Sequence, residues 1–148
     1  MLKPLLIVAS LLAATGCSFG QDMQAAEQGV AQFRTMVEAG DYDRVYEAAS
    51  PALKQVTSRE ELARVLGAVH DRLGPVRQSN QTGFNVRHGT DGIVVNLTYS
   101  TQFASGNRAE TFIFRISGGS ARLVSYNVNS PALLEAPAAA TPTITVTR

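Results

Sequence analysis

The spacing of apolar residues changes once along the chain, at Gly74-Pro75, and this change constrains the fold more than any other feature. Before it, apolar residues recur every three or four positions, which is the period of a helix with one buried face. After it, they alternate with polar residues, which is the period of a strand. Helices followed by a run of neighbouring strands are typical of an α+β domain.

The helical part predicts a helical hairpin followed by further helix. We expect a helix from Met23, and Asp41 can cap a second, shorter one. Ser50-Pro51 is expected to begin another helical turn, because Ser caps helices and Pro suits the first helical position. The run Thr57-Ser58-Arg59-Glu60 predicts a capping box with Thr57 as the cap. Behind it, one face of the helix is apolar: Leu62, Val65, Leu66, Val69 and Leu73.

Three expected turns, at 89–92, 104–107 and 117–120, divide the second part into four strands. A four-residue loop at 104–107 puts two apolar rows on one face if Tyr99 pairs with Phe112 and Leu97 with Phe114. We therefore predict a curved antiparallel meander in that register, with the N-terminal helices packed on its concave face. The alternating residues expected to share its apolar face are Ile93, Val95, Leu97, Tyr99, Phe103, Phe112, Phe114, Ile116, Val124, Tyr126 and Val128.

The amino terminus has the pattern of a signal peptide: Lys3 precedes an apolar run that is too short to span a bilayer, which takes about 20 residues. Ala14-Thr15-Gly16-Cys17 resembles the lipobox of bacterial lipoproteins. The resemblance implies cleavage before Cys17 and a diacylglycerol on its sulfur, and Ser18 at the next position implies the outer membrane, facing the periplasm. The alternative is an ordinary secretory signal followed by an incidental cysteine.

These features predict four segments. Residues 1–16 are a signal peptide, 17–22 a lipidated tether, 23–130 one α+β domain and 131–148 a disordered tail rich in Pro, Ala and Thr. The alternation at 144–147 fits addition to a partner's sheet edge, but the composition favours a disordered end. Lys and Arg number 13 and Asp and Glu 12, so the chain lacks the basic surface that nucleic-acid binding needs.

Several short stretches are similar to the DUF4019 family of uncharacterised exported bacterial proteins, within the cystatin-like or nuclear-transport-factor-like superfamily. This resemblance implies a cone in which helices cover a curved sheet. That superfamily includes a steroid isomerase and dehydratases that work in the apolar pocket of the cone. The stretches that carry the resemblance are Val37-Glu38-Ala39-Gly40-Asp41-Tyr42, Leu73-Gly74-Pro75-Val76-Arg77, Ala109-Glu110-Thr111-Phe112 and Arg122-Leu123-Val124-Ser125-Tyr126.

The candidate pocket combines aromatic residues with one acid. Glu110 shares the inward row of Phe112, so it is either a base at the mouth of the pocket or a solvated residue at the start of a strand. We favour the solvated position, because no second acid lies on that row. The arginines of the helical part are interpreted as solvated and paired with acids at the surface: Arg34, Arg44, Arg59, Arg64 and Arg72. The candidate pocket residues are Phe33, Tyr99, Glu110, Phe112 and Tyr126.

No cofactor or metal is expected from the sequence. The two histidines, His70 and His88, form no cluster with cysteine at metal-ligand spacing, and Gly118-Gly119 lies between strands instead of before a helix. We expect a non-catalytic envelope module that holds a protein partner or a small apolar ligand. The alternatives are a pocket enzyme of isomerase or dehydratase type, or a structural accessory of an envelope complex. The polar outer row from Asn96 to Gln102 meets either water or another protein.

Overall fold

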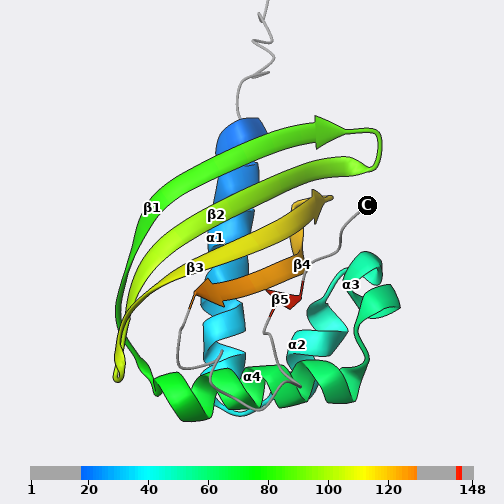
Figure 1. Cartoon of the computed structure of the whole chain (residues 1–148). Helices are drawn as coiled ribbons and strands as arrows, with labels where there is room; N and C mark the ends of the chain where they lie inside the picture. The colour runs from blue at the N-terminus through cyan, green and yellow to red at the C-terminus, as the bar shows by residue number, and fades with distance from the viewer. Residues whose placement is uncertain (1–17, 130–142, 145–148) are drawn as a thin grey trace, which may run out of the picture.

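The computed structural model describes residues 18–129 and 143–144. Four helices come first within this part of the chain (Figure 1): α1 (Ser18–Glu38), α2 (Tyr42–Ala48), α3 (Pro51–Val56) and α4 (Arg59–Leu73). The strands follow: β1 (Val76–Gly89), β2 (Gly92–Phe103), β3 (Gly106–Ser117), β4 (Ser120–Asn129) and β5 (Thr143–Ile144). The predicted α+β class is confirmed.

The strands form one antiparallel sheet in the order β1-β2-β3-β4-β5. The sheet curves around α1, which packs on β2, β3 and β4, while α4 crosses the lower end of the molecule (Figure 1). The apolar faces of the helices and the inward rows of the sheet share one core. Helices therefore cover one face of the sheet, and the polar outer row of β2 lies on the other.

The first helix begins earlier than the sequence predicted. Residues 18–22, predicted to be part of a tether, form the first turns of α1. The apolar period gave no sign of this extension, because a helical turn that buries little carries no apolar stripe. Cys17 and the predicted signal peptide lie outside the described residues.

Helix caps match the prediction at two of three places. Asp41 accepts a hydrogen bond from the backbone N–H of Arg44, and Ser50 accepts one from that of Leu53. At α4 the cap is Ser58, which accepts from the Glu61 N–H at 3.1 Å, so the prediction of Thr57 was wrong by one residue. The reason is that the N–H of Thr57 still bonds to the Leu53 carbonyl at the end of α3.

The register of β2 with β3 differs from the prediction by two residues. Tyr99 pairs with Glu110 and Leu97 with Phe112, because the turn after Phe103 holds only two residues, 104 and 105. A shift of two leaves every side chain on its original face, so alternation alone does not distinguish the two registers. The turn is fixed by a contact that is distant in sequence: the N–H groups of 104 and 105 donate to the carbonyls of Pro75 and Leu73.

A register shift opposite Ile113 and Phe114 also alters the inward row of β4. Leu123, opposite Phe114, is buried, whereas Val124, which the prediction placed in the inward row, is only half-buried. Further along the strand, Tyr126 and Val128 are buried as expected.

The short strand β5 lies on the outer edge of β4. It pairs Thr143 with Asn127 and Ile144 with Tyr126. These two residues belong to the segment 131–148 predicted to be a disordered tail, and they join the edge of the chain's own sheet. The rest of that segment lies outside the described residues.

Close packing of α1 on the sheet depends on a glycine. A Cβ atom at Gly29 would lie 2.8 Å from Cε1 of Phe114, nearer than packed side chains allow, and 3.2 Å from Cβ of Ala121, which is tighter than most Cβ contacts. Both contact residues are held in the sheet, by β3 and β4. Glycine at this position therefore sets the distance between α1 and the sheet.

Candidate functional site

The four aromatic residues of the predicted pocket form one cluster between α1 and the sheet. The ring centroid of Phe33, on α1, lies 5.3 Å from that of Phe112 and 4.7 Å from that of Tyr126. Tyr99 meets Phe112 edge-on at 5.9 Å. These aromatic contacts add to the free energy gained by removing the rings from water. The aromatic residues predicted to line a pocket therefore contact one another directly.

Glu110 is buried, with only 2% of its surface exposed, so the favoured prediction of a solvated position was wrong. Both carboxylate oxygens accept hydrogen bonds. The Tyr126 hydroxyl donates to Oε1 at 2.8 Å, while Nη2 of Arg34 and the Thr101 hydroxyl donate to Oε2 at 2.7 and 2.5 Å. A buried carboxylate needs this compensation, since an unpaired one would cost several kcal/mol.

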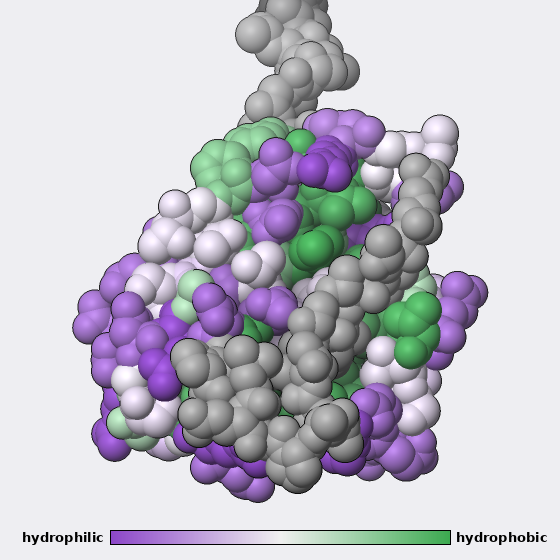
Figure 2. Space-filling view, viewed as in Figure 1, coloured by the Kyte–Doolittle hydropathy of each residue, from purple (hydrophilic) through white to green (hydrophobic). Residues whose placement is uncertain are grey.

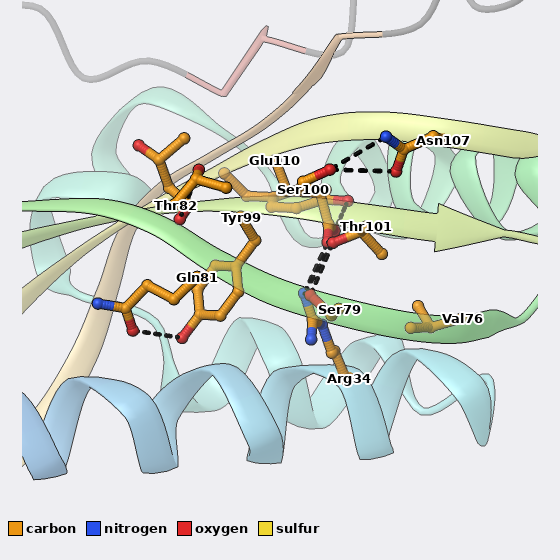
Figure 3. Close-up of polar contacts among 12 residues, drawn as sticks. Arg34, Val76, Ser79, Gln81, Thr82, Tyr99, Ser100, Thr101, Asn107 and Glu110 are labelled. Carbon is orange, nitrogen blue, oxygen red and sulfur yellow. Dashed lines mark hydrogen bonds and ion pairs between the residues drawn. The ribbon is translucent and has the colours of Figure 1, made fainter.

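The cation that pairs with Glu110 is Arg34, which the sequence analysis placed at the surface. Its side chain is 20% exposed, and Nη2 also donates to the hydroxyls of Ser79 (2.8 Å) and Thr101 (3.2 Å). Figure 3 shows the side chain reaching from α1 to these strand residues. The guanidinium carbon lies 5.0 Å from the centroid of the Tyr99 ring, within cation–π distance. One arginine therefore connects α1 to β1, β2 and β3.

Two signals in the sequence point to this arginine. Arg34 is four residues after Val30 and three before Val37, so it shares the apolar face of α1. Thr101 and Glu110 are the polar members of otherwise apolar inward rows. A cation on the apolar face of α1 and an acid on the inward row of β3 are complementary. Taken together, the two residues could have indicated a buried ion pair.

Burial raises the pKa values of the two tyrosine hydroxyls in the cluster. It raises the pKa of Tyr126 well above the ordinary value of 10.0, and the charge of Glu110 and the hydrogen bond to it act in the same direction. The pKa of Tyr99 is also raised, chiefly by burial and then by Glu27. Both phenols therefore keep their protons at neutral pH, and Tyr126 acts as a donor to Glu110.

The space beside the network is small. A cavity of about 20 Å³ lies among Phe33, Arg34, Glu110, Tyr126 and residues of α4 such as His70. That volume is close to the minimum for a single water molecule and far below the roughly 300–1,000 Å³ of small-molecule pockets. The space between the helices and the sheet is thus filled by the chain's own side chains.

A larger hollow lies between α1 and α2, away from the predicted pocket residues. This groove has a volume of about 620 Å³ and is open to solvent. Its lining combines small or apolar residues with one cation and one anion: Ala31, Gln32, Thr35, Met36, Arg44, Glu47 and Ala48. A smaller hollow of about 290 Å³ lies at the turn between β1 and β2 and includes Val94 and Arg115.

Other arginines of the helices form exposed ion pairs, as predicted. Arg44 pairs with Asp41, Arg64 with Glu61, and Arg59 with both Asp43 and Glu47. Exposed pairs of this kind contribute little to stability, because water screens them and both side chains lose freedom. Arg34 differs from them because its partner is almost fully buried.

Within residues 18–129 and 143–144, His, Cys, Asp and Glu form no group of three or more that could hold a metal ion. In the same part of the chain, no helix is long and apolar enough to cross a membrane.

The fold and the buried network define an α+β protein in which an arginine of α1 is bonded to three strands of the sheet, β1, β2 and β3. The chain belongs to the DUF4019 family, described as a protein of unknown function, whose model matches residues 29–126. The match begins at Gly29 in α1 and ends at Tyr126 in β4, so it includes Arg34, Glu110 and the aromatic cluster. Comparison with curated proteins finds no match.

Proposed function

We propose that this protein is a lipid-anchored, non-catalytic interaction module of the bacterial envelope, held in the outer membrane and facing the periplasm. The lipobox-like residues before Cys17 support the anchor. The curved sheet around α1 supports the finer assignment to the cystatin-like or nuclear-transport-factor-like superfamily. One fold of this kind serves many functions, so the assignment of function rests on the site.

The state of Glu110 is the observation that carries the non-catalytic part of the proposal. A pocket enzyme of isomerase or dehydratase type needs an acid or base that can exchange a proton with a bound substrate. Here one carboxylate oxygen accepts from Tyr126, and the other accepts from Arg34 and Thr101. The adjoining cavity of about 20 Å³ has no room for a substrate. The geometry supports a structural role for the network.

The same filling of the cone favours a protein partner over a small apolar ligand. The aromatic rings that could line a ligand pocket instead contact one another at centroid distances of 4.7 to 5.9 Å. Binding is then a property of the outer surfaces, whether the partner is a regulated protein or a fixed envelope complex.

In-cell photocross-linking tests the interaction role. A photoreactive residue is placed at Gln32 in the α1–α2 groove, or at Ser100 on the outer face of β2. We expect a stoichiometric protein adduct from one of the two positions. The same adduct should disappear when a bulky charge is added on that surface, for example by Ala48→Arg in the groove. Absence of a protein adduct at both positions would contradict the interaction role.

The anchor is tested separately by metabolic labelling with a fatty acid. We expect the full chain to incorporate the label and to float with membranes, and the Cys17→Ser variant to do neither. A wild-type chain without label, secreted in soluble form, would support the ordinary secretory signal instead.

A further inference from the structure

We propose that the first turn of α1 and the middle of β1 form a membrane-contact surface, in which Phe19 and Phe84 lie in the lipid interface. This inference rests on the proposed lipid anchor at Cys17. It assigns an orientation to the domain: the N-terminal end of α1 sits on the bilayer, and the α1–α2 groove points away from it.

The first observation is an exposed aromatic pair. Phe19 is 53% exposed and Phe84 57%, and their ring centroids lie 6.2 Å apart. They come from elements far apart in the sequence, α1 and β1. In Figure 2 a hydrophobic area lies at the end of the molecule where α1 begins, beside β1. Two large rings that meet and yet remain exposed leave apolar area that a suitable partner would cover.

The second observation is the absence of a tether. Because α1 begins at Ser18, only two peptide units separate Cys17 from Phe19. Their Cα atoms lie at most about 7 Å apart in any conformation of the chain. An acyl chain on Cys17 would therefore bring Phe19 to the interface. The six-residue tether predicted from the sequence, if extended, would have let the domain stand about 20 Å away.

Together, these two observations indicate that lipid covers the exposed rings. At the boundary between headgroups and acyl chains, apolar faces that carry Trp, Phe or Leu sink about 5–10 Å into the bilayer. A protein partner at this surface would have to share the space with the acyl chains of Cys17. The groove residues Ala31 to Met36 lie about three and a half to five helical turns after Ser18, which is about 20–27 Å along the helix at about 1.5 Å per residue. They therefore face the periplasm.

A single tryptophan tests the contact, because the chain contains none. Phe84→Trp places the probe in the proposed surface. Val56→Trp, at a 58% exposed position on α3, is the matched control. The acylated full chain is reconstituted in vesicles of phosphatidylethanolamine and phosphatidylglycerol, with and without brominated phosphatidylcholine. We expect the probe at position 84 to shift to the blue and to be quenched severalfold more than the probe at position 56.

Flotation of the same vesicles separates the two proposals. If the full chain recovered from cells carries no acyl group and fails to float, the anchor itself is wrong. If it floats but the probes at positions 84 and 56 are quenched equally, the membrane contact is overturned and the anchor stands. As a further check, Phe19→Ser should reduce quenching of the probe at position 84 without abolishing flotation, since the acyl chains remain.

Discussion

Two phenylalanines on α1 meet aromatic residues of the sheet in different surroundings. Phe33 lies 5.3 Å from Phe112 and is buried, whereas Phe19 lies 6.2 Å from Phe84 and is half exposed. The ring distances are similar, but only Phe33 is enclosed by further side chains of the core. A ring contact is therefore not the same as burial. The domain therefore has an enclosed half around Phe33, which holds the fold together, and an open end around Phe19.

The charged network belongs to the enclosed half. Arg34 follows Phe33 directly and reaches Glu110, which adjoins Phe112 along the inward row of β3. The carboxylate that a pocket enzyme would use as a base instead holds α1 against the sheet. At the open end, α1 meets β1 through the exposed rings of Phe19 and Phe84, which are available for contact with another surface.

The largest expected difference is between Phe33→Ala and Phe19→Ala. Truncating the buried ring removes apolar burial and leaves a cavity, so we expect the free energy of unfolding to fall by about 3–5 kcal/mol. Truncating the exposed ring should change it by about 0.5 kcal/mol or less. Urea unfolding of the soluble domain measures both. Similar losses for the two variants would show that the open end is as well packed as the enclosed half.

Glu110→Ala should also destabilise the domain by about 3–5 kcal/mol, because it leaves Arg34 without its buried partner. Replacing the pair together, Arg34→Met with Glu110→Leu, should restore part of the loss, since apolar residues of similar volume often substitute for a buried ion pair. The rest of the loss stays, because the buried Tyr126 hydroxyl no longer has its acceptor. A double-mutant cycle on unfolding free energies measures the coupling. Simple additivity of the two single losses would mean that the pair does not act as a unit.

Gly29→Ala tests the close approach of α1 to the sheet. The new methyl group would crowd the Phe114 ring, and we expect a net loss of about 1–2 kcal/mol, even though alanine favours the helix. Gly67→Ala in α4 is the matched control, because its nearest atom, on Tyr42, lies at an ordinary 3.7 Å. The control should gain about 0.5–1 kcal/mol. Thermal unfolding compares the two, and a stabilising Gly29→Ala would refute the tight contact.

The smallest expected effect is a loss of folding stability above pH 10. The folded-state pKa of Tyr126 is raised by burial and by Glu110, so above pH 10 the unfolded chain loses this proton while the folded chain keeps it. Stability should therefore fall as pH rises above 10, by up to about 1.4 kcal/mol per pH unit for this group. Tyr126→Phe should flatten that slope. An unchanged slope in the variant would assign the alkaline loss to other groups.

The sequence predicted the class of fold and most inward rows, because periods of 3.6 and 2 follow directly from burial of one face. It did not predict the β2–β3 register, since a shift of two residues keeps Tyr99 and Phe112 on the same face. The backbone hydrogen bonds that fix the turn come from Leu73 and Pro75, about 30 residues earlier in the chain. Such contacts leave no local pattern in the sequence.

In the candidate site, too, features with a local sequence pattern were predicted, and contacts between residues far apart in the sequence were not. The aromatic residues of the cluster were singled out as candidate pocket residues, because each of them lies on an apolar row. The burial of Glu110 was missed, because its partner Arg34 lies 76 residues away and each residue taken alone is typical of a surface. The extension of α1 to Ser18 was missed for another reason: its first turn buries too little to show a helical period.

The most direct test of the central claim uses the double variant Arg34→Met with Glu110→Leu. Its unfolding free energy and its in-cell cross-linking are measured on the same protein. If the network only fastens α1 to the sheet, the variant will fold, remain anchored and give the same protein adduct as the wild type. A well-folded, anchored variant that gives no adduct would contradict the account, because it would show that the buried pair takes part in the function itself.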